Sequence, residues 1–166
     1  MTQPASVPAD GNLKVQWVPV VAIPTAPTIG EINAGGSKEL SCYLTAEGFT
    51  PSTEEQAIVD LRLCSRQEFE RRGRFKDGLD LGYIYNPVSA PDNQAYITMT
   101  PGTLGFIAVR WGVAFETAFA AAQTIDLVPV ECGIRKKQPP TANSVLIVMQ
   151  KMFIRSTVQR DVAIAP

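Results

Sequence analysis

Histidine is absent from the 166 residues of the sequence, and this absence excludes several common active sites. Histidine is the usual general base near neutral pH, and it belongs to Ser-His-Asp and Cys-His nucleophile pairs and to most zinc sites. Many enzyme classes and most zinc-site patterns are therefore excluded.

Cysteine is scarce as well. Cys42, Cys64 and Cys132 are odd in number, lie far apart and form no C-x-x-C pattern. Disulfide frameworks use an even number of cysteines and belong to oxidising compartments. We expect all three to be reduced, buried thiols of a protein that folds in the cytoplasm.

Long apolar runs and an excess of positive charge are also missing. The longest uncharged apolar run, Trp17 to Ile23, contains Pro19 and is far shorter than the roughly 20 residues of a membrane helix. Residues 1–14 lack a basic stretch before an apolar core, so we expect no signal peptide and no membrane contact. A net charge of −1 argues against a dedicated DNA-binding protein.

What the sequence does contain is β-branched residues. Valine and isoleucine together number 27 against 10 leucines, and 13 threonines raise the β-branched total to 40. Such side chains suit a pleated, half-buried surface better than a helix. A length of 166 residues fits one domain with one core. The composition predicts a mainly β, single-domain protein.

The first 27 residues contain five prolines, whose fixed φ and missing N–H disfavour regular structure. We expect an extended, Pro-rich N-terminal arm over residues 1–27, followed by a β-domain over residues 28–166. Terminal segments fray unless something holds them, and a neighbouring subunit is our candidate for that anchor.

Two short helices are expected within the β-domain. The first covers residues 28–33, with Thr28 as N-cap and Glu31 at the capping-box position. The second covers residues 92–99, with Asp92 as its cap. Residues 115–122 keep some helical spacing, but we favour an apolar loop there.

Alternating or continuous apolar patterns predict the strands. In the clearest strand, Leu79, Leu81 and Tyr83 fall on one face. A turn over residues 46–52 separates the first two strands, and a hairpin turns near Gly73. The expected strands are residues 38–44, 57–64, 67–72, 76–85, 104–111, 124–134, 145–154 and 157–164.

The most highly charged segment runs from Arg62 to Asp77, where basic and acidic residues alternate around Phe69 and Phe75. One interpretation is a nucleic-acid patch, with arginines on phosphates and aromatic rings stacked on bases. The interleaved acids cancel much of the positive field, so we favour contact with another copy of the chain, or simple solvation. The candidate contact residues are Arg66, Glu68, Glu70, Arg71, Arg72, Arg74 and Lys76.

Several stretches together resemble the major tail proteins, or tail tube subunits, of long-tailed bacteriophages, especially those of actinobacterial hosts. The resemblance rests on combined order and spacing and covers nearly the whole chain. The stretches are SCYLTAEGFTPSTEEQ (41–56), RLCSRQEFERRGRF (62–75), YIYNP (83–87), PGTLGFIAVRWG (101–112) and ETAFAAAQTIDLVPVECGIRKKQPPTANSV (116–145).

This resemblance implies a β-sandwich or barrel-like tail tube fold that forms hexameric rings, which stack into a hollow conduit for DNA delivery. It implies a non-enzymatic protein with no catalytic residue, metal ion or cofactor, located in the virion tail and assembled in the host cytoplasm. It also implies tape measure, tail terminator and distal tail proteins as partners. The main alternative is a tail terminator or head-tail joining ring. A small-ligand-binding β-barrel or a histidine-free hydrolase is a more distant alternative.

DNA in transit should pass through such a tube without being held. Carboxylates repel phosphate, whereas clustered lysine and arginine bind it, so we expect an acidic lumen. The acidic residues within or beside predicted strands are our lumen candidates. They are Asp80, Asp126, Glu131 and Asp161.

Overall fold

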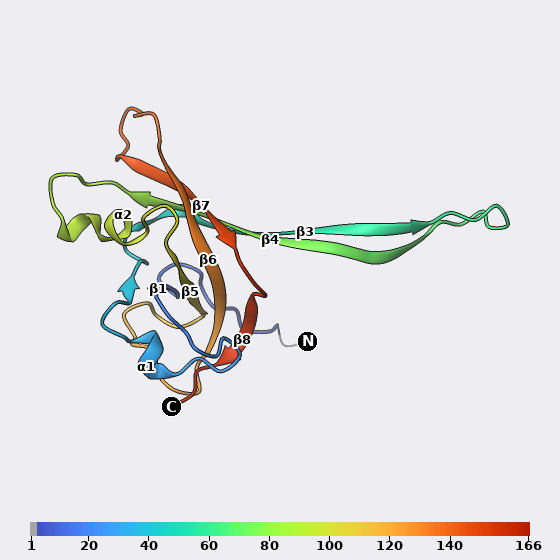
Figure 1. The fold of residues 1–166 in the computed structure, drawn as a ribbon, viewed down its shortest axis with the longest axis horizontal. Helices are drawn as coiled ribbons and strands as arrows, with labels where there is room; N and C mark the ends of the chain where they lie inside the picture. Colours follow the sequence, from blue (N-terminus) through green and yellow to red (C-terminus); the bar gives the residue numbers. More distant parts are fainter. Residues whose placement is uncertain (1–2) are drawn as a thin grey trace.

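The computed structural model describes residues 3–166 as one curled antiparallel sheet with two short α-helices (Figure 1). Its eight strands follow the order β2-β1-β5-β6-β7-β4-β3, and β8 pairs with β6. The strands are β1 (Leu13–Val18), β2 (Lys38–Glu39), β3 (Leu44–Asp60), β4 (Phe69–Ile84), β5 (Leu104–Trp111), β6 (Thr124–Lys137), β7 (Ile147–Ile154) and β8 (Gln159–Ala163). The mainly β prediction with short helices is confirmed.

Two apolar clusters pack on opposite faces of the sheet. The larger cluster contains Leu79, Leu81 and Tyr83, so the predicted alternation in β4 is confirmed. The smaller cluster joins β1, β5 and β6 to α1 (Ile29–Ile32) and to Phe119. Because this second cluster covers only part of its face, the rest of that face, over β6, β7 and β4, has no covering layer in the described structure.

The first helix forms as predicted and the second differs in detail. Thr28 caps α1, and its hydroxyl and the Glu31 side chain complete a capping box. Residues 92–99 contain a 3-10 turn (Pro91–Asn93) followed by α2 (Gln94–Thr98). The Asp92 cap was wrong, because Asn93 occupies the N-cap and no side chain caps this helix. Residues 115–122 form the expected loop.

The two turns predicted over residues 46–52 and near Gly73 were wrong. Strand β3 continues through residues 46–52, with an irregular register between Leu44 and Phe49, and β4 runs through Gly73. The connection between the two strands is therefore residues 61–68. Gly73 serves a close approach, since a Cβ there would lie 2.7 Å from the Gln56 carbonyl oxygen. Pro51 is tolerated because β3 is an edge strand, where no second neighbour needs its N–H.

Strand β1 lies within the range 1–27 that we expected to be an irregular arm, and it pairs with β2 and β5 inside the sheet. Residues 3–12 contain no strand or helix, and residues 1 and 2 of the predicted arm lie outside the described part. Strands β2 and β7 are shorter than the strands predicted over residues 38–44 and 145–154. Val145 and Leu146, the first two residues of the predicted strand, are exposed.

Only one cysteine matches the expectation of buried thiols. Cys132 is buried on the core side of β6, and burial raises the pKa of its thiol to about 11. Cys42 and Cys64 are exposed. Both lie in connections, the turn before β3 and the loop 61–68, where no sheet face is available to cover them.

Candidate assembly surface

The most conspicuous feature of the molecule is a two-stranded ribbon that projects from the body (Figure 1). Strand β4 pairs with β7 from Leu79 onward, whereas its residues 69–78 pair only with β3. We call residues 52–78 the arm, which is distinct from the predicted N-terminal arm over residues 1–27. The arm comprises the outer parts of β3 and β4 and the loop 61–68.

Both edges of the arm are open within residues 3–166, since neither strand has a second neighbour there. Unpaired edges present free N–H and C=O groups that can pair with another chain. An isolated two-stranded hairpin is only marginally stable in water. The arm therefore has the geometry of an element that is completed by contact with another molecule.

Large apolar side chains on the arm are also exposed. Ile58, Val59, Phe69 and Phe75 are about half-exposed on the ribbon, although the arm packs against no core of its own. The loop at the tip adds exposed leucines, Leu61 and Leu63. Apolar surface gathered on one projecting element marks an interaction site more often than scattered surface residues do.

The charged residues predicted for subunit contact all lie on the arm. Arg66 and Glu68 belong to the loop, and the others belong to β4. Two groups are paired within the arm: Arg72 contacts Glu55 at 2.6 Å, and Asp60 lies between Arg62 and Arg71. Because the arginines and Glu55 are exposed and Asp60 is half-buried at the surface, these ion pairs add little stability and leave the arginine charges accessible.

The root of the arm is fixed to the body through β8. The Asp77 carboxylate accepts hydrogen bonds from Arg160 at 2.6 Å and from the Thr53 hydroxyl at 2.7 Å. Alongside, Phe49 of β3 packs edge-on against Trp111 with ring centroids 5.9 Å apart. These contacts hold the arm in one direction relative to the sheet.

The four acidic lumen candidates do not form one surface. Asp80 and Glu131 alternate with core residues of β4 and β6, so they lie on the sheet face opposite the larger cluster, and Glu131 pairs with Arg155 at 3.1 Å. Asp126 lies on the other face, where it accepts hydrogen bonds from the Trp111 indole and the Asp161 backbone. Asp161 itself has a positive φ of 54° in β8.

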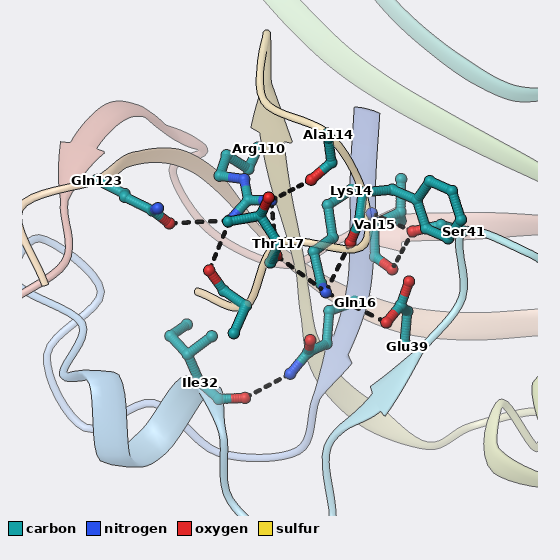
Figure 2. A network of polar contacts seen from close by, with 12 residues as sticks. Lys14, Val15, Gln16, Ile32, Glu39, Ser41, Arg110, Ala114, Thr117 and Gln123 are labelled. Carbon is teal, nitrogen blue, oxygen red and sulfur yellow. Dashed lines mark hydrogen bonds and ion pairs between the residues drawn. The ribbon is translucent and has the colours of Figure 1, made fainter. Parts of the chain in front are cut away.

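A buried polar network that the sequence analysis missed holds the loop 112–123 (Figure 2). Arg110, only 1% exposed, donates to the carbonyls of Ala114, Thr117 and Ala118 and to the Gln123 side chain at 2.8–3.0 Å. Burial lowers the pKa of its guanidinium. The sequence signal was a single arginine in the otherwise apolar strand LGFIAVRW.

Lys14 of β1 supports the same loop from the neighbouring strand (Figure 2). Its ammonium donates to the carbonyls of Phe115 and Thr117 and pairs with Glu39 at 3.2 Å. The Phe119 ring lies 5.0 Å from the Arg110 guanidinium and 5.5 Å from the Lys14 ammonium. Two buried cations thus bind mainly neutral carbonyls and fix the loop over the smaller core.

Nothing in the described residues resembles a metal site. No group of three or more His, Cys, Asp or Glu side chains among residues 3–166 is placed to hold a metal ion. Over the same residues, the helices are too short to cross a bilayer.

One solved structure shares this fold, and one family model matches the chain. A chain in the cryo-EM structure of the anti-feeding prophage baseplate, 6-fold symmetrised, superimposes with a TM-score of 0.57, covers 96% of each chain and is 10% identical in sequence. No curated protein matches the chain. The family model for phage tail tube proteins matches residues 1–166, the entire sequence, and the chain therefore belongs to the phage tail tube protein family.

Proposed function

We propose that copies of this protein assemble head-to-tail into closed rings, and that the rings stack into a hollow tube through which phage DNA passes. Membership of the tail tube family gives the protein a structural role in the phage tail, and so a place in the virion. The proposal adds the ring, the tube and the DNA passage. The arm, with open edges and exposed apolar side chains, is the observation that carries it.

A head-to-tail contact joins one surface of a copy to a different surface of the next. Such contacts generate a ring when the rotation closes and a helical stack when it continues along an axis. Six copies per ring is our proposed number, taken from the symmetry of the anti-feeding prophage structure. Each contact would cover strand edges that are open in the single chain, which removes their tendency to aggregate.

The proposed activity is geometric rather than chemical, so the protein acts as a wall and a conduit. We propose that it meets a tape measure protein, a tail terminator and distal tail proteins at the ends and inside of the tube, and that assembly takes place in the host cytoplasm. The arm residues between Arg66 and Lys76 are the proposed contacts between subunits or rings.

Electron microscopy of the purified protein in negative stain tests the proposal. Tubes are expected. Isolated rings that never polymerise would instead favour a tail terminator or joining ring, and stable monomers with a bound small molecule would favour a ligand-binding β-barrel. Removing the loop 61–68 and joining β3 to β4 by a short turn is expected to abolish tubes while leaving the monomer folded, as judged by circular dichroism.

The acidic lumen is a separate part of the proposal. Asp80 and Glu131 share one face of the sheet, so they are the two candidates that can line one lumen together, whereas Asp126 lies on the opposite face. Replacing Asp80 by lysine is expected to slow DNA ejection from assembled particles, because lysine holds phosphate. Asp80 is more informative than Glu131, whose carboxylate already pairs with Arg155. An unchanged ejection rate for a correctly assembled variant would remove that residue from the lumen.

A further inference from the structure

Two cations stand at the end of β6 on the sheet face that carries the larger cluster. Arg135 and Lys137 pair in register with Gln150 and Val148 of β7, and both of these partners are buried on that face. Lys136 lies between the two cations and therefore projects from the opposite face.

Little negative charge lies near these cations. None of the three cations at the end of β6 forms an ion pair within residues 3–166. The segments that surround them, residues 81–103 and 132–150, contain a single acid, Asp92. This end of the sheet is therefore positively charged.

Two stacked tyrosines hold Arg135 and Lys137 in fixed positions. The Arg135 guanidinium lies 4.0 Å from the centre of the Tyr96 ring, and the Lys137 ammonium lies 4.5 Å from the centre of the Tyr85 ring. The centres of the two rings are 4.8 Å apart, and Arg135 also donates to the Met99 carbonyl at 3.2 Å. Tyrosine and arginine are enriched among the residues that anchor protein interfaces. We call Tyr85, Tyr96, Arg135 and Lys137 the basic end.

Acidic side chains gather at the other end of β6, around Trp111. Trp111 continues the core-facing alternation of β5, so it lies on the face of the larger cluster, and it is 53% exposed. Its indole N–H donates to Asp126 at 2.8 Å, and Asp126 also accepts from the backbone N–H of Asp161. Backbone hydrogen bonds bring the turn that carries Asp10 next to the loop that carries Glu116. We call Trp111, Asp10, Glu116, Asp126 and Asp161 the acidic end.

The cations near the acidic end are already bound to other groups. Arg110 and Lys14 are buried and donate to carbonyls of the loop 112–123. Arg160 pairs with Asp77 at 2.6 Å at the root of the arm. The four carboxylates of the acidic end form no ion pair within residues 3–166, so this end keeps its negative charge.

The two ends cannot meet within one chain. Between Asp126 and Lys137, β6 spans about 35 Å at about 3.3 Å per residue. Figure 1 shows the same separation, with β8 near one end of the body and the loop after β6 at the other. Since exposed charges are screened over about 8 Å at physiological salt, each end interacts only with what lies directly against it.

We propose that the basic end of one copy binds the acidic end of another copy. The inference rests on the proposed head-to-tail assembly, in which each copy offers its two ends to two different neighbours. Contacts between like ends would place like charges together, so the charges favour a polar series of copies over two-fold pairs. Trp111 and the two tyrosines supply apolar contact area. The contact also places Asp126, which does not share the face of Asp80, between copies and not in the lumen wall.

Charge reversal at matched positions tests the contact. Lys137→Glu is expected to lower the assembled fraction about fivefold or more at equal concentration, because a carboxylate then faces the acidic end. Glu116→Lys should have a similar effect, and the double variant E116K/K137E should recover most of the assembly. Lys136→Glu is the matched control, because it makes the same charge change one residue away on the opposite face, and it should assemble normally. Circular dichroism checks that each variant is folded. An equal loss for Lys136→Glu and Lys137→Glu, or no recovery in the double variant, would overturn the inference.

Cross-linking of the unmodified protein gives a second test that does not depend on folding of a variant. A carbodiimide joins an ammonium group to a carboxylate that touches it, without a spacer. Applied to tubes made from mixed isotope-labelled and unlabelled chains, it should join Lys137 of one chain to Asp10, Glu116 or Asp161 of another. Tubes in which other lysines are joined between chains but Lys137 forms no such link would refute the inference and leave the tube proposal intact. Failure of the native protein to form rings or tubes would refute the tube proposal itself.

Discussion

Replacement of Arg110 by methionine tests how the fold holds the loop 112–123. Methionine keeps an unbranched apolar stem, but it removes the donors for three backbone carbonyls and the Gln123 side chain. Thr117 retains a longer bond to Lys14 at 3.3 Å, whereas the carbonyls of Ala114 and Ala118 lose their side-chain donor.

The magnitude follows from two opposing terms. Each hydrogen bond from a charged donor contributes about 1.5–3 kcal/mol, so four of them contribute on the order of 6–12 kcal/mol. Burying the guanidinium costs several kcal/mol, and here the Nε atom has no partner to offset its own desolvation. The difference gives an expected loss of about 3–5 kcal/mol in the free energy of unfolding, as for other buried ionic groups that lose a partner.

Urea unfolding followed by the fluorescence of Trp17 and Trp111 measures this loss, at a concentration where the chain is monomeric. The matched control is Arg155→Met, which removes an exposed arginine and its ion pair with Glu131. That variant should lose less than about 1 kcal/mol. A loss below about 1 kcal/mol for Arg110→Met would show that the loop does not depend on the buried cation.

Three further predictions concern local features. Because burial raises the pKa of the Cys132 thiol to about 11, iodoacetamide at pH 8 should label two cysteines in the folded monomer and all three in urea, as counted by mass spectrometry. Backbone N–H groups of Ala22 and Thr28 lower the pKa of Glu31, so Glu31→Gln should cost about 0.5–1 kcal/mol at pH 7. Since a lowered pKa stabilises the fold above the unfolded value of about 4.3, this difference should vanish as urea titrations move to lower pH, and a constant difference would contradict the assignment. Gly48→Ala would place a Cβ against the Gly82 carbonyl oxygen, so we expect a loss of about 1–3 kcal/mol by thermal unfolding, whereas Gly30→Ala meets open space and should be neutral.

Features fixed by neighbouring residues were predictable from the sequence. The abundance of β-branched residues indicated the sheet, residues 104–111 form a strand with the predicted bounds, and Thr28 and Glu31 form their capping box. These features depend on side-chain shape, period-2 alternation or contacts three residues apart. The interactions that stabilise these features lie almost entirely within a short segment, so the sequence of that segment is enough to predict them.

The length of the arm was not predictable in this way. Gly48 and Pro51 indicate a turn when considered alone, yet β3 continues past both, because Gly82 approaches Gly48 closely and because Pro51 lies on an open edge. Gly73 likewise marks a close contact between β3 and β4 and not a hairpin. In each case the decisive partner lies more than ten residues away in the chain.

The charged residues show the same contrast between features set by neighbours in sequence and features set by distant strands. The seven contact candidates were found together because they are close in sequence, and β4 and the adjoining loop keep them on one arm. The acidic candidates, drawn from β4, β6 and β8, were expected on one surface, but strand alternation and pairing place Asp80 and Asp126 on opposite faces.

Composition and local pattern thus fixed which kind of secondary structure forms and where several elements begin, because propensity and capping act over a few residues. Strand pairing decided the rest: which edges stay open, how far the arm projects, and where Gly133 lets β7 approach β6 closely. Register and burial are properties of segments distant in the chain, so they exist only once the sheet has formed.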